Sequence, residues 1–188
     1  MADDMMMNTD DLLKTASLLV EMEDYSTAMT AFNTVFNQDS KCVEAHHIRG
    51  YAGKYFENYE ETIKEFDRVI ELEPGYAGAY YNRGCINREG DKKRAIRDFT
   101  KAIKLKSDYA EAYNNRGSLH EDIGNYKQAI RDFSKAIKLR PDYAMAYVNR
   151  GIAYARHDKK SLLSISDIKK ATKLGYELAK DLSGRGGF

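Results

Sequence analysis

Residues 110–143 read AEAYNNRGSLHEDIGNYKQAIRDFSKAIKLRPDY, and this stretch contains two helical patterns separated by a turn. Apolar residues in its second half recur at the spacing of one face of an α-helix. They are Ala129, Ile130, Phe133, Ala136 and Ile137. Gly124 and Asn125 are typical of the end of one helix and the start of the next, and Pro141 ends the second helix because proline lacks the backbone donor. We therefore predict a hairpin of two α-helices.

The same pattern recurs along the chain in steps of 33 to 35 residues. A glycine series lies in the first half of each unit and consists of Ala16, Gly50, Gly84, Gly117 and Gly151. A phenylalanine series lies in the second half and consists of Phe32, Phe66, Phe99, Phe133 and Ile168. Because two separate series keep nearly the same steps, we predict an array of structural repeats.

Units of this length resemble tetratricopeptide repeats, and the matching positions are Tyr113, Gly117, Ala129, Phe133, Ala136 and Pro141. The resemblance implies an all-α fold, a right-handed superhelical solenoid of five helix pairs plus a C-terminal capping helix. The expected repeats are residues 9–42, 43–76, 77–109, 110–143 and 144–178. A disordered N-terminal segment, 1–8, is expected before them, and the end of the capping helix with a frayed tail, 179–188, after them.

Two repeats depart from the pattern. The third is one residue short, and we expect its first helix to be shortened. The fifth is one residue long before its second helix, where we expect a local irregularity. Tyr176, Leu178 and Leu182 are expected to cover the apolar end of the last repeat, because solenoids need a cap.

An arginine precedes the glycine in four repeats, and an acidic residue precedes the phenylalanine-series residue in the same four. The arginines are Arg49, Arg83, Arg116 and Arg150, and the acids are Glu65, Asp98, Asp132 and Asp167. The first repeat has neither, because Thr15 and Ala31 occupy these places. This joint absence favours an ion pair between the two helices of one repeat, since a guanidinium can bind a carboxylate with two bonds.

The composition argues against several classes of protein. The chain has 30 Lys and Arg against 29 Asp and Glu, so its net charge of +1 gives no general attraction to nucleic acid or to an anionic membrane, although it is compatible with a local patch. Two cysteines are too few for a disulfide framework and favour a reducing compartment. With no long apolar run, we expect a cytoplasmic protein without membrane association. The sequence contains no motif typical of a metal site, a cofactor site or a catalytic site, so we expect that the protein is not an enzyme and binds no cofactor.

The resemblance also implies a binding surface, because in this family the first helices line the concave face of the superhelix. The family's ligand-facing offsets give an expected peptide-binding groove of Tyr51, Tyr55, Tyr81, Asn82, Arg88, Asn114, Asn115, Ser118, Glu121, Asp122, Val148, Asn149 and Ile152. Along these residues, aromatic side chains give way to acidic and then to apolar ones. This order predicts a ligand with a basic or polar middle and an apolar end.

Asn82, Asn115 and Asn149 recur once per repeat within this groove. An amide both donates and accepts, so a ladder of them can hold an extended peptide backbone. The arrangement resembles the asparagine ladder in the repeat domain of O-linked N-acetylglucosamine transferase. The alternative is that each asparagine bonds a neighbouring helix of its own chain.

These features predict a protein–protein interaction adaptor or scaffold that binds a peptide or partner protein in the concave groove. No nucleic-acid partner is expected. A self-assembly module that forms a homodimer is the first alternative. A helical-repeat RNA binder is the second, and a basic stripe on the concave face would support it.

Overall fold

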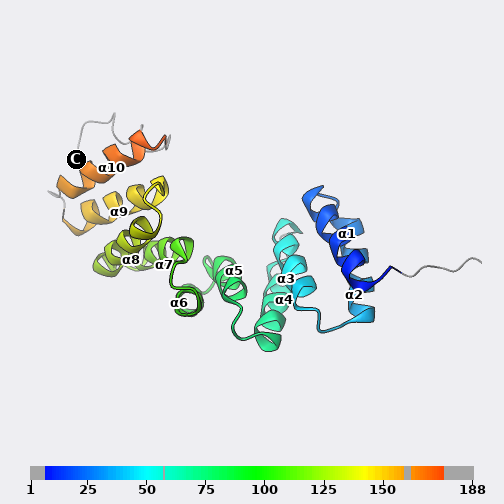
Figure 1. Ribbon diagram of the computed structural model, residues 1–188. Helices are drawn as coiled ribbons and strands as arrows, with labels where there is room; N and C mark the ends of the chain where they lie inside the picture. Colours follow the sequence, from blue (N-terminus) through cyan, green and yellow to red (C-terminus); the bar gives the residue numbers. More distant parts are fainter. Residues whose placement is uncertain (1–6, 57, 159–161, 176–188) are drawn as a thin grey trace, which may run out of the picture. The chain divides into compact units, whose positions relative to one another are not determined.

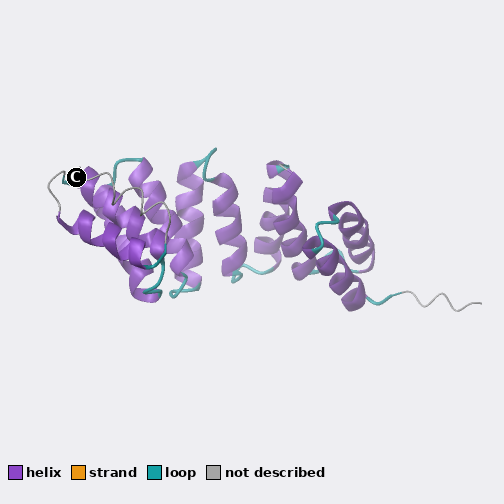
Figure 2. Cartoon of the chain, turned by 90° about the horizontal axis from the view of Figure 1, so that it is seen from above, coloured by secondary structure: helices purple, strands orange, loops and turns teal. Residues whose placement is uncertain are grey.

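The structure, a computed structural model, describes residues 7–56, 58–158 and 162–175, without the side chains of Tyr55 and Phe56. These residues form helices joined by short loops, with no strand among them (Figure 2). The α-helices are α1 (Thr9–Glu21), α2 (Tyr25–Gln38), α3 (Val43–Ala52), α4 (Tyr59–Leu72), α5 (Ala77–Asn87), α6 (Lys92–Leu105), α7 (Ala110–Asp122), α8 (Tyr126–Leu139), α9 (Ala144–His157) and α10 (Leu162–Lys173), and a 3-10 turn, η1 (Gly53–Phe56), follows α3. The expected all-α fold of helix pairs is confirmed (Figure 1).

The chain divides into two compact units, Met1–Ile86 and Asn87–Phe188. In the first unit, α1 packs against α2 and α3 packs against α4. In the second unit, α7 packs against α6 and α8, and α9 packs against α8 and α10. We call α1, α3, α5, α7 and α9 the first helices, and α2, α4, α6, α8 and α10 the second helices.

The phenylalanine series forms the centre of the core in both units. Phe32, Phe66, Phe99 and Phe133 are fully buried, and Ile168 takes the corresponding place on α10. One turn later the second helices bury a smaller residue, for example Val69 on α4 and Ala136 on α8. Each second helix therefore places one side chain of the phenylalanine series in the core with smaller buried side chains on the same face.

The glycine series allows the first and second helices to approach closely. A Cβ atom on Gly117 would lie 2.8 Å from Cε1 of Phe133, and one on Gly50 would lie 3.0 Å from Cε1 of Phe66. At Gly151 the nearest atoms include Cδ1 of Ile168, at 3.1 Å. In these three repeats the side chain of the paired helix, Phe66, Phe133 or Ile168, therefore occupies the space that a Cβ atom would need.

Asparagine or aspartate side chains begin most of the second helices. Asp24, Asn58, Asp91 and Asn125 each accept a hydrogen bond from the backbone N–H three residues later. Such caps satisfy a helix N–H group that has no partner within the helix. Asn8 caps α1 in the same way, although most of the segment predicted as disordered, residues 1–8, lies outside the described residues.

The first helices differ in length. Helix α5 has 11 residues against 13 in α7 and 14 in α9, as expected for the short third repeat. Helix α3 is shorter still, with 10 residues, because the backbone tightens into η1 at Gly53. The sequence analysis did not predict that change.

The predicted arginine–acid pairs form within repeats in three places. Arg116 binds Asp132 through two hydrogen bonds of 2.8 Å, and Arg150 binds Asp167 through two of 2.7 Å. Arg49 donates to Glu65 over 2.5 Å. Arg83 and its predicted partner Asp98 belong to different units.

Each of these arginines also contacts the preceding repeat, which was not predicted. The acceptor is the residue directly after the phenylalanine-series residue of that repeat. The contacts are Arg49 to Asn33, Arg83 to Asp67, Arg116 to Thr100 and Arg150 to Ser134. In Arg49, Arg116 and Arg150, one guanidinium group therefore links the two helices of its own repeat to each other and also to the repeat before.

No described helix is long and apolar enough to span a bilayer. The expected cap residues Tyr176, Leu178 and Leu182 lie outside the described residues. The repeat boundaries and the superhelical course of the whole array stay predictions.

Candidate functional site

The expected groove residues of the first unit differ in accessibility. Tyr51 on α3 is exposed, Tyr81 on α5 is half-buried, and Asn82 is buried. The side chain of Tyr55 lies outside the described part of the chain. Only Tyr51 therefore presents a largely open side chain, and Lys54 lies over its ring at 4.7 Å from the centroid.

The amide of Asn82 is bonded on both sides by its own chain. Nζ of Lys54 lies 3.1 Å from Oδ1, and Nε2 of His47 lies 3.1 Å from Nδ2. An ammonium group only donates, so Oδ1 must accept from Lys54, and Nδ2 must then donate to His47. His47 is thereby held as the tautomer with its proton on Nδ1, which lies 3.4 Å from the hydroxyl of Tyr76.

Burial has electrostatic consequences in this cluster. Burial and the neighbouring ammonium of Lys54 lower the pKa of His47. Burial likewise lowers the pKa of Lys54, partly opposed by interaction with Cys85. Both shifts favour the neutral forms of groups that the fold removes from water.

The asparagines of the second unit also bond between repeats. Nδ2 of Asn149 donates to Oδ1 of Asn114 over 3.0 Å, the same relationship that Asn82 has to His47 thirty-five residues earlier. Asn114 is 2% exposed, so it serves as a buried partner. Asn115 is half-buried. The Oδ1 of Asn149 has no protein partner among the described residues.

Val148 does not line a surface, contrary to its place in the predicted groove. It is 1% exposed and packs with Ile168 and Ala171 of α10. Ile152, one turn later on α9, is half-buried at the edge of the same cluster. The α10 helix covers this side of α9. The family's ligand-facing offsets, which we call the offset rule, could not indicate this cover because they consider one helix at a time.

The acidic part of the predicted groove is neutralised within the chain. Glu121 lies 3.0 Å from Arg156, and Asp122 lies 3.2 Å from Lys92. Burial raises the pKa of Glu121; the Arg156 charge opposes this shift and Asp122 adds to it. The expectation of a ligand with a basic middle therefore loses its basis.

Two other expected residues differ in their free hydrogen-bonding capacity. Ser118 donates to the backbone oxygen of Asn114 over 3.2 Å. Arg88 is half-buried, and its Nε is enclosed without a protein hydrogen bond in the described structure, 4.0 Å from Glu89.

A groove of about 480 Å³ lies between the first helices α1 and α3. Its lining residues are Asp10, Leu13, Lys14, Ser17, Leu18 and Glu44. Leu18 is 58% exposed, whereas Leu13 forms part of the core below. The groove thus combines an aliphatic floor with charged groups of both signs. The sequence analysis missed its α1 residues because it assigned ligand-facing offsets only from the second repeat onward.

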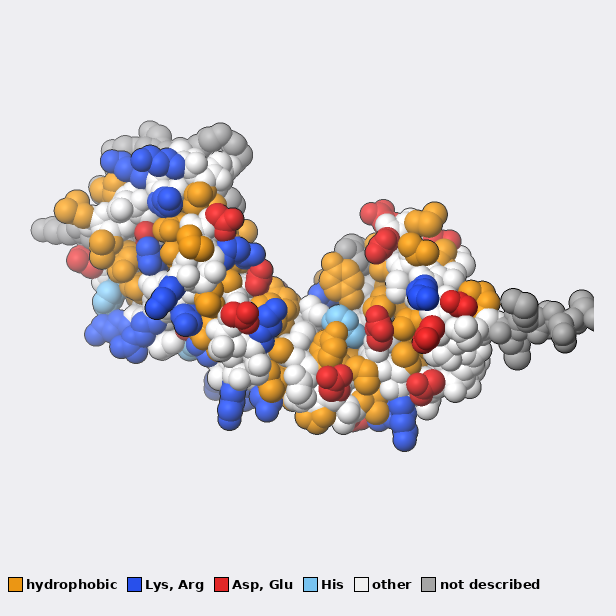
Figure 3. Space-filling model, in the orientation of Figure 1, with side chains coloured by type: hydrophobic (Ala, Val, Ile, Leu, Met, Phe, Trp, Pro, Cys, Tyr) orange, Lys and Arg blue, Asp and Glu red, His pale blue; other side chains and the backbone are white. Residues whose placement is uncertain are grey.

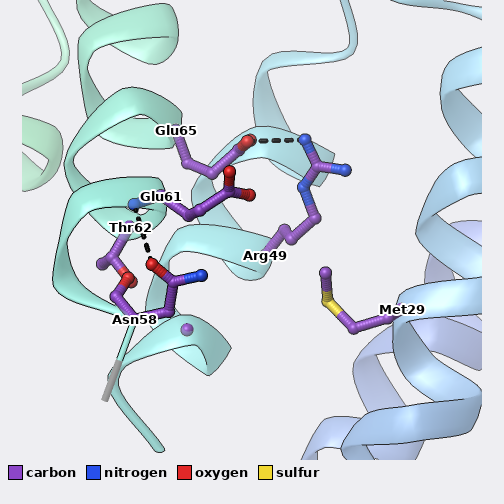
Figure 4. Close-up of a pocket in the computed structure, with 7 residues that line it drawn as sticks. Met29, Arg49, Asn58, Glu61, Thr62 and Glu65 are labelled. Carbon is purple, nitrogen blue, oxygen red and sulfur yellow. Dashed lines mark hydrogen bonds and ion pairs between the residues drawn. The ribbon is translucent and has the colours of Figure 1, made fainter. Parts of the chain in front are cut away.

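A second pocket, of about 300 Å³, lies beside η1 (Figure 4). It is lined by Met29, Arg49, Gly53, Asn58, Glu61, Thr62 and Glu65. Gly53 lets η1 pack directly against Thr62 at the edge of this space, since a Cβ atom there would meet Oγ1 of Thr62. The other repeats carry Leu19, Asn87, His120 and Tyr154 at the corresponding position. Arg49 and Glu65 are paired, and hydrogen bonds from His46 and Arg49 hold the pKa of Glu65 low although burial alone would raise it. We interpret this pocket as a packing consequence of Gly53.

No cluster of three or more His, Cys, Asp or Glu side chains that fits a metal ion occurs in the described ranges. The candidate site therefore consists of side chains on helix surfaces, many of them bonded within the chain, and of the groove between α1 and α3.

Comparison with known families gives two matches. A tetratricopeptide-repeat family model matches residues 110–143, and a second model of the same repeat matches residues 77–109. The comparison with curated proteins gives no significant match.

Solved structures with the same arrangement of helices are numerous. A crystal structure of MamA protein is 26% identical, covers 92% of this chain and 94% of its own, and has a TM-score of 0.78. YrrB, described as a tetratricopeptide-repeat protein with an unusual peptide-binding site, is 19% identical, with 94% and 92% coverage and a TM-score of 0.76. PilF of Pseudomonas aeruginosa is 14% identical, with 94% and 85% coverage and a TM-score of 0.79. The likeness to YrrB and PilF concerns the fold alone.

Proposed function

Because residues 77–109 and 110–143 match tetratricopeptide-repeat models, and proteins built from such repeats are protein-interaction modules, we propose that this chain is a scaffold that binds a peptide segment of a partner protein on its first helices. The observation that carries the proposal is the groove between α1 and α3. It is large enough for several side chains of a bound segment, and it lies between two first helices.

The lining of this groove indicates the kind of segment it fits. Leu18 offers exposed apolar surface, and burying one aliphatic side chain against it contributes about 1.5–3 kcal/mol. Asp10 and Glu44 supply acceptors, and Lys14 supplies a donor. A segment with one aliphatic side chain flanked by charged residues of both signs complements this lining.

The asparagines take unequal parts in this proposal. Asn149 retains a free acceptor, so it suits contact with a peptide N–H group. Asn82 would have to exchange its bonds to Lys54 and His47 for bonds to a ligand. We therefore place the binding role on the α1–α3 groove of the first unit, keep Asn149 as a separate candidate contact in the second unit, and assign Asn82 a structural role.

The proposal is tested with peptides selected from a random display library against the whole chain. Affinities are then measured for the wild type, for Leu18→Asp in the groove and for Leu163→Asp on α10, which matches Leu18 in exposure at 55%. We expect Leu18→Asp to weaken binding about tenfold or more, through lost apolar contact and a buried charge, and Leu163→Asp to have no effect.

One control and one contradicting outcome complete the test. Light scattering at several concentrations separates peptide binding from self-association of the chain, the alternative use of exposed repeat ends. If Leu18→Asp and Leu163→Asp bind the selected peptides as the wild type does, the α1–α3 groove is not the binding site.

A further inference from the structure

Charge is distributed unequally between the two units. Residues 87–188 contain 23 of the 30 Lys and Arg but only 13 of the 29 Asp and Glu. The net charge is therefore +10 in this part and −9 in residues 1–86. The near-zero total of the whole chain conceals this asymmetry.

The cations of the second unit follow one face of each second helix. On α6 and α8 they lie at positions i, i+4, i+8 and i+11, which share one side of an α-helix. They are Lys93, Arg97, Lys101 and Lys104 on α6 and Lys127, Arg131, Lys135 and Lys138 on α8. We call these eight residues the basic face. Figure 3 shows Lys and Arg side chains gathered over the two helices. Each row extends about 16 Å along its helix at 1.5 Å per residue.

The basic face contains few opposing charges. The acids of α6 and α8, Asp98 and Asp132, are buried, and Asp132 is bound by Arg116. The exposed cations Lys93, Arg97, Lys104, Lys127, Arg131 and Lys138 have no carboxylate partner among the described residues. Lys92 and Arg140, next to the face, are paired with Asp122 and Glu111.

The corresponding positions of the first unit have no such face. On α2 they hold the uncharged residues Ser26, Thr30, Thr34 and Asn37. On α4 they hold Glu60, Lys64, Arg68 and Glu71, which pair as Lys64 with Glu60 and Arg68 with Glu71. The basic face is thus a property of the second unit alone and not of the repeat.

We propose that the basic face docks the protein onto an anionic phospholipid bilayer. Six of its eight cations are lysines. A lysine carries a point charge on a flexible stem, which suits a fluid, negatively charged surface, whereas the planar guanidinium of arginine suits fixed, bidentate binding of one group. Clusters of four to eight Lys and Arg on a helical surface are typical of binding to anionic lipids. The acidic first unit is repelled by the same surface, so the protein binds through its second unit.

Nucleic acid fits this face less well. Single-stranded binding needs exposed aromatic side chains for base stacking, but Phe99 and Phe133 are buried and Tyr126 is half-buried. The basic residues also lie on second helices. The basic stripe that would support RNA binding was expected on the concave face, which the first helices line.

The test is sedimentation of the whole chain with large vesicles of phosphatidylcholine alone or mixed with one third phosphatidylserine. The variant Arg97→Glu with Arg131→Glu reverses two charges of the basic face. The matched control Lys64→Glu with Arg68→Glu reverses two charges at α4 and changes the net charge equally. Circular dichroism establishes that both variants keep their helices; if the first does not, Lys93→Gln with Lys127→Gln replaces it.

We expect binding to the phosphatidylserine vesicles only, with loss on raising salt from about 0.1 to about 1 M as the Debye length falls from ~10 to ~3 Å. Each unit of charge removed from the basic face should weaken binding about fivefold, so Arg97→Glu with Arg131→Glu, which changes the charge by four units, should lose a factor of about six hundred. The α4 variant should bind within about threefold of the wild type, because its charges lie on the other unit.

Three results would overturn the proposal. The first is no sedimentation with phosphatidylserine vesicles. The second is equal loss in the two variants, which would mean attraction by net charge alone. The third is tighter binding to a single-stranded RNA or a DNA duplex at the same phosphate concentration, which would make the face a nucleic-acid surface.

Discussion

Arg116 donates two hydrogen bonds of 2.8 Å to the carboxylate of Asp132 and a third, of 3.0 Å, to the hydroxyl of Thr100. Asp132 is nearly inaccessible, with a side chain 4% exposed. The arginine thereby connects α7 to its own second helix, α8, and to the preceding second helix, α6. Arg150 has the same contacts one repeat later, with Asp167 and Ser134.

Replacing Asp132 by alanine should destabilise the second unit by about 3 kcal/mol, because the half-buried guanidinium of Arg116 loses its charge partner. Replacing Asp122, in the exposed pair with Lys92, should cost less than about 1 kcal/mol. Urea unfolding monitored by circular dichroism measures both variants. Equal losses would show that burial does not strengthen the Arg116–Asp132 pair.

Gly117→Ala should destabilise the second unit by about 1–3 kcal/mol, because the new Cβ would lie 2.8 Å from Cε1 of Phe133 and force α7 away from α8. Gly90→Ala is the control in the same unit, since a Cβ there meets no atom within 4 Å. Thermal unfolding should show a lower midpoint for Gly117→Ala only. A normal midpoint for Gly117→Ala would mean that the helices are not held at this distance.

Asn82→Ala should cost more stability than Asn149→Ala. The first leaves Nζ of Lys54 and Nε2 of His47 without their hydrogen-bond partner in a half-buried place, which we expect to cost about 2–3 kcal/mol. The second removes one donor to Asn114 and should cost about 1 kcal/mol. Unfolding free energies of the two variants check the order, and the reverse order would contradict the structural role of Asn82.

The stability of the first unit should fall as the pH drops below His47's ordinary pKa. Because folding lowers this pKa from 6.5, the unfolded chain takes up a proton at a pH where the folded chain still resists it. The contribution is therefore complete above about pH 7 and is lost between 6.5 and the lower folded pKa.

His47→Gln keeps an acceptor for Asn82 but does not titrate. The difference in unfolding free energy between the wild type and His47→Gln should thus shrink with acidification below about pH 6.5. His120→Gln makes the same test in the second unit, since burial lowers the pKa of His120 as well. A difference that stays constant with pH would show that His47 titrates equally in both states.

The helix pairs and the core could be predicted from the sequence because they depend on spacing. Gly117 and Phe133 lie 16 residues apart on the two helices of one hairpin, and their contact follows from the hairpin itself. The Arg116–Asp132 pair has the same local origin. The second bond of the arginine, to Thr100, was missed because many residue types can accept it and no charge pattern marks it.

The candidate site was harder to predict because partners of polar side chains come from neighbouring repeats. The offset rule placed Val148 on a ligand-facing surface, but Ile168 and Ala171 of α10 cover it. It placed Glu121 in an acidic region, but the long side chain of Arg156 reaches and neutralises it. Offsets fix the direction of a side chain on its helix, whereas coverage and pairing depend on the particular residues of the next helix.

The claim that a partner peptide binds on the first helices is tested most directly by backbone amide chemical shifts. A peptide selected as described above is titrated into the isotopically labelled chain. We predict that the perturbed amides cluster on α1 and α3 around Ser17, Leu18 and Glu44. Perturbations confined to α2, α4, α6, α8 and α10 would contradict the claim.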